Sequence, residues 1–124
     1  MTYVVLVTVL ILFHYTYMGY QVGMARGKSG VKAPKMTGDE TFERTLRVQL
    51  NTMEQLIVTL PALWMCAVYF NPLVAAILGF AFFVGRVIYG IAYIKDPSTR
   101  TLGMTIGFLA NILLLVGAVV GVVL

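Results

Sequence analysis

The amino-acid sequence predicts an all-α integral membrane fold, a bundle of four transmembrane helices that forms one domain over residues 1–124. The chain is 60% hydrophobic and only 11% charged, whereas soluble domains are about 25% charged. The charges are confined to two windows, because residues 1–25, 55–85 and 101–124 contain no Lys, Arg, Asp or Glu. These observations exclude a soluble domain. The net charge of +4 is therefore expected in two loops beside a bilayer and does not indicate a nucleic-acid-binding surface.

The first expected span covers residues 2–24, long enough to cross about 30 Å of hydrocarbon at about 1.5 Å per residue. Residues 25–38 follow as a polar loop, which contains Arg26 and three lysines. Thr37 and Glu40 have the spacing of a capping box. We therefore expect Thr37 to be the N-cap of the second helix.

The second expected span, residues 39–70, would be about 48 Å long, more than the hydrocarbon requires. Its first turns should project into water or headgroups. Asn71 and Pro72 form a short turn before the third span, residues 73–94. Asp96 and Pro97 suit an N-cap and the first helical position, respectively, of the fourth span, residues 98–123. In that span Gly103 and Gly107 have the spacing of closely packed membrane helices.

Four spans place the loop after the first and the loop after the third on the same side of the membrane. Both of these loops carry the cations, so the positive-inside rule makes that side cytoplasmic. We expect both termini on the non-cytoplasmic side. Polar residues at the ends of the second and third spans should then meet at the cytoplasmic boundary.

Two polar faces stand at that boundary. On a helix, Arg47, Asn51 and Glu54 fall at i, i+4 and i+7 and share one face of the second span. Arg86, Tyr89 and Tyr93 fall at i, i+3 and i+7 and share one face near the end of the third span. Arg100, in the first turn of the fourth span, lies on the same side of the membrane. Charged and polar groups at membrane depth are costly, so they are a functional-site hypothesis by default.

The residue types point to an anionic ligand, because cations outnumber carboxylates in this set. Arginine forks grip carboxylates in a bidentate manner, tyrosine hydroxyls donate to them, and Glu54 suits a ligand amine or an arginine. Arg100 lies where the helix dipole disfavours a cation, which a bound anion would relieve. A thiol with an ordinary pKa of about 8.5 would ionise more readily there and become a nucleophile. Structural ion pairs are the alternative explanation for these residues, and we expect Arg86 to be structural.

The chain has one histidine and one cysteine, His14 and Cys66, so it offers no metal-ligand set and no internal disulfide. Cys66 lies within an apolar run and is expected to be a buried small hydrophobic residue.

At the polar residues the chain resembles the MAPEG family, the membrane-associated proteins in eicosanoid and glutathione metabolism, over nearly its whole length. The pattern most similar to it is that of the microsomal glutathione transferases and the leukotriene-conjugating synthase. The residues that carry the resemblance are Glu43, Arg44, Arg47, Gln49, Asn51 and Glu54, then Arg86, Tyr89 and Tyr93, and finally Arg100.

The resemblance implies a homotrimer of four-helix protomers with glutathione bound between adjacent subunits near the cytoplasmic face. It implies that glutathione contacts Arg47, Asn51, Glu54, Tyr89 and Tyr93, with Arg26 and Gln49 reaching it from the neighbouring subunit. It also implies that Arg100 is catalytic and stabilises the glutathione thiolate. The second substrate would be a lipophilic electrophile that enters from the bilayer lipid.

Two positions depart from the leukotriene-conjugating pattern. Gly27 stands where that pattern has a second arginine, and Gln55 where it has a tyrosine. These departures argue against leukotriene specificity and leave Arg100 in place. The expected function is therefore that of a membrane glutathione S-transferase, with glutathione-dependent reduction of lipid hydroperoxides as a second reaction.

Two other functions remain open from the sequence. A non-catalytic lipid-binding adaptor of the same family is the main alternative, and the intact glutathione pattern with Arg100 argues for the enzyme. A transporter or a purely structural bundle would require charges along a path through the membrane, and residues 55–85 carry none.

Overall fold

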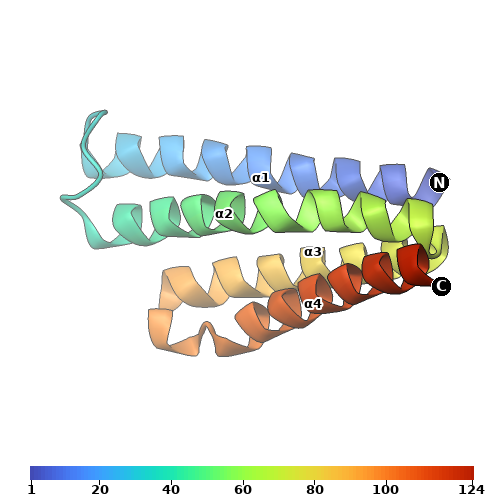
Figure 1. Ribbon diagram of the computed structural model, residues 1–124. Helices are drawn as coiled ribbons and strands as arrows, with labels where there is room; N and C mark the ends of the chain where they lie inside the picture. Colours follow the sequence, from blue (N-terminus) through green and yellow to red (C-terminus); the bar gives the residue numbers. More distant parts are fainter.

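The computed structural model describes all of residues 1–124 and contains α1 (Thr2–Ser29), α2 (Glu40–Tyr69), α3 (Pro72–Lys95), the 3-10 turn η1 (Pro97–Thr99) and α4 (Thr101–Val123). Each of the four α-helices is long and apolar enough to cross a membrane, which confirms the predicted four spans. The helices run side by side along one direction (Figure 1). Both termini lie at one end of the bundle, and the α1–α2 and α3–α4 connections lie at the other, here called the polar end.

The first helix is longer than the sequence indicated. It continues beyond the expected end at residue 24 to Ser29, so Arg26 lies in its last turn and not in the loop. Arg26 and Lys28 stand where the helix dipole is negative and favours cations. Gly30 then ends the helix with φ 76°, a conformation that costs glycine little, and its N–H donates to Arg26 O at 2.9 Å.

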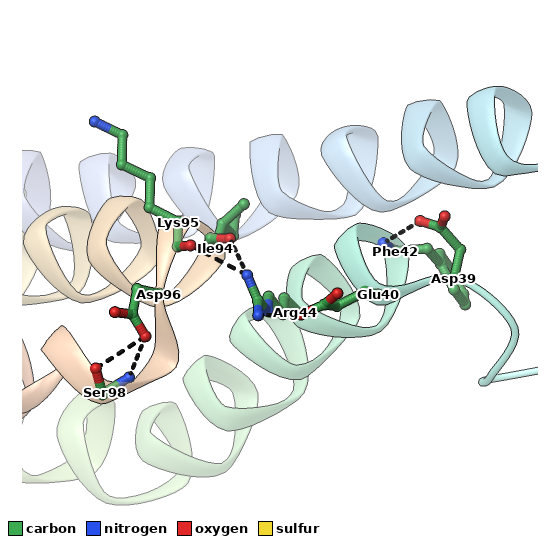
Figure 2. Close-up of polar contacts among 8 residues, drawn as sticks. All are labelled: Asp39, Glu40, Phe42, Arg44, Ile94, Lys95, Asp96 and Ser98. Atoms are coloured by element: carbon green, nitrogen blue, oxygen red, sulfur yellow. Dashed lines mark hydrogen bonds and ion pairs between the residues drawn. The ribbon is translucent and has the colours of Figure 1, made fainter.

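The capping prediction for the second helix was wrong by two residues. Asp39, and not Thr37, is the N-cap, and its Oδ2 accepts a hydrogen bond of 2.9 Å from the N–H of Phe42 (Figure 2). Glu43 reaches back and accepts a hydrogen bond of 3.2 Å from the N–H of Gly38. Asp39 and Glu43 therefore cap this helix start together, although Glu43 bonds to the residue before the N-cap and not to the N-cap itself as in a capping box.

The other two caps follow the sequence more closely. Asn71 Oδ1 caps α3 by accepting from the N–H groups of Leu73 and Val74 at 2.8 and 3.1 Å. Asp96 is an N-cap with Pro97 at the first position, as predicted, although the helix it opens is η1 and not α4. Its Oδ1 accepts from the backbone N–H and the hydroxyl of Ser98 at 3.1 and 2.9 Å (Figure 2). These bonds hold the pKa of the Asp96 carboxyl below its usual value.

Packing between α3 and α4 is close, because glycine allows the two backbones to approach. A methyl group added at Gly103 would overlap the backbone N of Tyr89 and come within 2.6 Å of the carbonyl oxygen of Gly85. At Gly107, one turn later, the nearest atom would be 3.7 Å away. Of the predicted pair, Gly103 is therefore the residue that the contact requires, and it sets the distance between Tyr89 and the start of α4.

Buried polar contacts join the helices in pairs, as is common between membrane helices. Trp64 of α2 donates from Nε1 to the hydroxyl of Thr8 in α1 at 3.1 Å. Thr59 of α2 lies 2.7 Å from Oδ1 of Asn111 in α4. Cys66 is fully buried among apolar residues, as expected.

Candidate functional site

The site begins on the face of α2 that carries Arg47, Asn51 and Glu54. Arg47 Nη2 and Glu54 Oε1 lie 3.5 Å apart, and the two side chains are 50% and 54% exposed. An ion pair this open contributes about 1 kcal/mol or less. The pair is therefore easily separated by a ligand that brings its own carboxylate and amine.

Arg86 of α3 is the most deeply buried charge, with 3% of its surface exposed. Its Nη2 donates to Asn51 Oδ1 at 2.8 Å, and its Nε and Nη2 lie 3.3 and 2.9 Å from the hydroxyl oxygen of Thr52. The guanidinium also lies over the ring of Tyr89, 4.1 Å from the centroid. Arg86 thus ties α3 to α2 through neutral acceptors and an aromatic face, in agreement with the structural role expected for it.

The contact with Arg86 fixes the orientation of the Asn51 amide. Arginine can only donate hydrogen bonds, so the Asn51 oxygen must face Arg86. The Asn51 Nδ2 group is left as a donor for whatever binds beside it. Asn51 is therefore suited to a ligand carboxylate or carbonyl and not to an amine.

Tyr89 and Tyr93 extend this group along α3. Their rings are stacked with centroids 5.5 Å apart, and Tyr89 is almost completely buried while Tyr93 is partly exposed. Gly103 packs against the backbone of Tyr89, which brings the start of α4, preceded directly by Arg100, beside this part of α3. Arg47 and Tyr93 line one pocket, Arg86 links Tyr89 to Asn51, and Glu54 joins them through its ion pair with Arg47. The predicted residues that the protomer gathers here are called the Tyr89 group: Arg47, Asn51, Glu54, Tyr89, Tyr93 and Arg100.

Arg100 lies in the short linker between η1 and α4, directly before the first residue of α4. It is exposed, its Nη1 donates to Pro97 O at 2.8 Å, and it forms no ion pair with a carboxylate. The sequence placed Arg100 within the first turn of the helix, and the structure places it one position earlier. The unfavourable position of an unpaired cation at the positive end of a helix dipole remains.

Arg26 and Gln49 do not join this group within the protomer. Arg26 Nη1 donates to Lys35 O at 2.7 Å, and its guanidinium lies 4.6 Å from the centroid of the Phe42 ring. Gln49 points to the opposite side of α2 from Arg47, where its Nε2 lies beside Gly19 of α1. Both residues are partly exposed, so they are open to a second subunit.

A pocket of about 580 Å³ opens at the polar end, beside Arg47 and Tyr93. Its charged lining residues are Asp39, Glu40, Glu43, Arg44 and Arg47, and the others are Met36, Gly38, Leu46, Leu50 and Tyr93. The volume lies within the usual range for small-ligand sites. Its lining combines carboxylates and guanidinium groups, which suits a ligand that carries both signs of charge.

Arg44 has a role that the sequence did not reveal. Its Nη1 donates to the carbonyl oxygens of Ile94 and Lys95 at 3.3 and 3.1 Å, and its Nη2 pairs with Glu40 (Figure 2). It thereby satisfies the last carbonyls of α3 and places a cation at the negative end of that helix. Arg44 fastens the start of α2 to the end of α3, the segment that carries Tyr93.

Thr52 and Asn111 hold buried polar partners on neighbouring helices, a role that the sequence did not indicate. Both are polar residues within apolar runs, which was the available signal. Their partners lie on other helices, 34 and 52 positions away in the chain, so the pairing required the packed structure.

The comparisons with known proteins agree with this architecture. The MAPEG family model matches residues 4–120. The chain is 44% identical over 117 residues to the uncharacterized protein sll1147 of Synechocystis sp., covering 94% of this chain and 85% of the relative. It is 36% identical over 111 residues to human microsomal glutathione S-transferase 2, covering 88% of this chain and 76% of the relative.

A third relative is leukotriene C4 synthase of Cavia porcellus, 34% identical over 94 residues, or 76% of this chain and 63% of the relative. The family model covers nearly all of the chain, and the four apolar helices have the lengths that a membrane requires. The chain is an integral, multi-pass membrane protein that belongs to the MAPEG family.

Proposed function

We propose that this protein is a membrane glutathione S-transferase that conjugates the thiolate of glutathione to lipophilic electrophiles from the bilayer. The observation that carries the proposal is the group around Tyr89: a separable Arg47–Glu54 pair, an Asn51 amide oriented by Arg86, and an unpaired Arg100. Relatives named as a glutathione S-transferase and as leukotriene C4 synthase support it.

Glutathione is a tripeptide with two carboxylates and one amine, so its charges suit this group. Arg47 binds one carboxylate and Glu54 binds the amine once the ligand replaces their mutual contact. Asn51 donates from Nδ2, and the Tyr93 hydroxyl adds a donor beside the pocket. Separating the exposed Arg47–Glu54 pair costs little free energy, so most of the free energy of the new contacts between protein and ligand contributes to affinity.

Arg100 is the catalytic residue in this proposal. A thiol brought beside its guanidinium, at the positive end of the α4 dipole, has a lowered pKa and ionises near neutral pH. The resulting thiolate attacks the electrophile. A bound anion also removes the electrostatic penalty that Arg100 suffers in the free protein, so binding and ionisation support each other.

The complete site requires a second copy of the chain. In the proposed homotrimer, Arg26 and Gln49 of one subunit reach the glutathione held by the next. The support is that both residues lie apart from the Tyr89 group within their own protomer and are partly exposed. The polar end carries the cationic loops and so faces the cytoplasm, with both termini on the opposite side.

Turnover by the purified protein in detergent tests this function. The protein is supplied with glutathione and a 1-chloro-2,4-dinitrobenzene-type electrophile, and in parallel with a lipid hydroperoxide. A glutathione conjugate formed faster than in protein-free detergent supports the transferase, and oxidised glutathione in the second assay supports the peroxidase reaction. Glutathione binding without turnover of either compound would identify the non-catalytic adaptor instead.

A further inference from the structure

A second pocket, of about 320 Å³, lies deeper along the bundle between α2 and α4. Asn51, Gln55, Arg86, Thr105 and Gly107 line it, with Met104 and Phe108 at the apolar side. Met104, Thr105 and Phe108 are exposed on the outer surface of α4, so the pocket is accessible from the hydrocarbon. Asn51 belongs both to this pocket and to the proposed glutathione site, so the two adjoin.

The polar groups of this pocket are turned so that hydrogen-bond donors face the ligand. Asn51 and Gln55 lie one turn apart on α2. The Asn51 oxygen is occupied by Arg86 Nη2 at 2.8 Å, and the Gln55 oxygen accepts from Asn111 Nδ2 at 3.2 Å. The Asn51 Nδ2 and Gln55 Nε2 groups therefore remain free.

Asn111 is the residue that keeps Gln55 in this orientation. Asn111 is only 5% exposed, and its Oδ1 lies 2.7 Å from the hydroxyl oxygen of Thr59. The Thr59 hydroxyl also lies 2.9 Å from the backbone carbonyl of Gln55, but it has a single proton to donate. The 2.7 Å contact is typical of O–H···O and short for N–H···O, so the hydroxyl donates to the Asn111 oxygen and the Asn111 amide nitrogen faces Gln55. The chain from Thr59 through Asn111 thus directs the Gln55 nitrogen to the pocket.

We infer that Gln55 binds the oxygen atom of the lipophilic substrate and selects electrophiles whose reaction places negative charge on oxygen. Within the proposed transferase, on which this inference rests, Gln55 is a specificity-determining residue and Asn111 its positioning residue. Donors aimed at a developing charge in a site of low dielectric stabilise the transition state more than the ground state. The wall contains no carboxylate that would repel such an oxygen.

With an α,β-unsaturated aldehyde as the electrophile, the reaction is a conjugate addition of the glutathione thiolate. The glutathione sulfur forms a bond to the β-carbon, and the electron pair of the carbon–carbon double bond moves toward the carbonyl, whose oxygen becomes an enolate. Gln55 Nε2 donates to that oxygen. The proton released when the thiol ionised returns through water to the α-carbon, so the product is the simple adduct and no further reactant is consumed.

Two electrophiles of similar apolar character separate this role from general binding. 4-Hydroxynonenal places the developing charge on oxygen, whereas 1-iodohexane releases iodide and contains no oxygen. The informative variant is Gln55→Glu, which keeps an oxygen for Asn111 but replaces the donor by an acceptor. Gln55→Met removes both, and Gln21→Glu in α1, outside this pocket, is the matched control for adding a carboxylate to a span.

We expect Gln55→Glu to lower kcat/KM for 4-hydroxynonenal by about tenfold or more and to change kcat/KM for 1-iodohexane less than twofold. Asn111→Leu should produce a smaller selective loss, chiefly in kcat, because it releases Gln55 without removing its donor. Gln21→Glu should leave the ratio of the two activities unchanged. Glutathione affinity, measured by calorimetry, verifies that each variant retains the folded site.

Equal losses with both electrophiles, or no loss with either, would overturn the role of Gln55 and leave the transferase intact. If Gln55→Glu misfolds, the same ratio is measured with Gln55→Met, and the same criterion applies. If the unmodified protein turns over the chlorodinitrobenzene-type electrophile but not 4-hydroxynonenal, this inference is overturned and the transferase stands. Absence of turnover of all three compounds would overturn the proposed transferase itself, and this inference with it.

Discussion

Arg86 Nη2 donates a hydrogen bond of 2.8 Å to Asn51 Oδ1, although Arg86 is only 3% exposed. The bond joins a buried cation of α3 to a residue that also faces the candidate ligand site on α2. It therefore links the stability of the bundle to the orientation of a binding group. No carboxylate pairs with Arg86, so neutral oxygens of α2 must stabilise its charge.

Thr52 supplies the second of those oxygens, and its loss should destabilise the bundle. In Thr52→Val the shape is kept, but Nε of Arg86 loses its acceptor at 3.3 Å and has no other, whereas Nη2 keeps Asn51 Oδ1. A buried donor left without a partner costs about 1–3 kcal/mol, and more when it is charged. We expect a lower midpoint in thermal unfolding of the protein in detergent.

The matched control is Thr16→Val, because Thr16 is exposed and bonds only to Leu12 O within its own helix. It should unfold at the temperature of the unmodified protein. Equal midpoints for the two valine variants would show that the Thr52 contact does not stabilise the buried arginine.

Gly103 and Gly107 should respond differently to the same substitution. In Gly103→Ala the new methyl group meets the backbone of Tyr89 and Gly85, which cannot move without separating α3 from α4. Overpacking of this kind costs about 1–3 kcal/mol. In Gly107→Ala the nearest atom is 3.7 Å away, an ordinary contact.

Thermal unfolding of the two alanine variants measures this difference directly. A clear loss of stability in Gly103→Ala alone is the expected result. If both variants unfolded at the temperature of the unmodified protein, the close packing of α3 against α4 at Gly103 would be contradicted.

Arg100→Ala should slow the conjugation of glutathione to a chlorodinitrobenzene-type electrophile. Without the guanidinium, the bound thiol has a higher pKa, so less thiolate is present at neutral pH. The loss should shrink as the pH rises toward the ordinary thiol pKa of about 8.5, because ionisation then no longer depends on the protein. Rates measured across this range, with the ultraviolet absorbance of the bound thiolate, test both points.

An unchanged rate and an unchanged thiolate absorbance in Arg100→Ala would contradict the catalytic assignment. Lys28→Ala is a suitable control, since Lys28 is another exposed cation of the polar end outside the Tyr89 group. It should retain the pH profile of the unmodified protein.

Chemical crosslinking in mild detergent tests the shared site. We expect the crosslinked products to end at three copies of the chain, because Arg26 and Gln49 are proposed to contact glutathione across a subunit boundary. A mixture of Arg26→Ala and Arg47→Ala chains should regain part of the binding lost by each alone, since some boundaries then carry both native residues. Products that stop at one or two copies would contradict the trimer.

The sequence predicted the four spans because uncharged apolar runs of sufficient length are read directly from composition. The set of Arg47, Asn51 and Glu54 also followed from helical spacing alone. Errors arose at helix ends, where several candidate caps compete. Thr37 matched the capping-box pattern, but Asp39 is the N-cap of α2. Arg26 was expected in a loop, but α1 continues through it and ends only at Gly30, and the helix dipole favours a cation in that last turn.

Contacts between helices could not be read from the sequence. Arg44 contacts residues about 50 positions away, and its partners are backbone carbonyls that every residue possesses. The free donors of Asn51 and Gln55 depend on which neighbour occupies each amide oxygen. Such orientation is a property of the packed bundle and not of any local pattern.

Calorimetric titration of the purified protein with glutathione tests the central claim most directly, namely that the group around Tyr89 binds a charged tripeptide. We predict saturable binding with one glutathione per chain, and binding weakened about tenfold or more in Arg47→Ala, which loses a charge-assisted contact to a ligand carboxylate. No binding by the unmodified protein, or equal affinity in Arg47→Ala, would contradict the account.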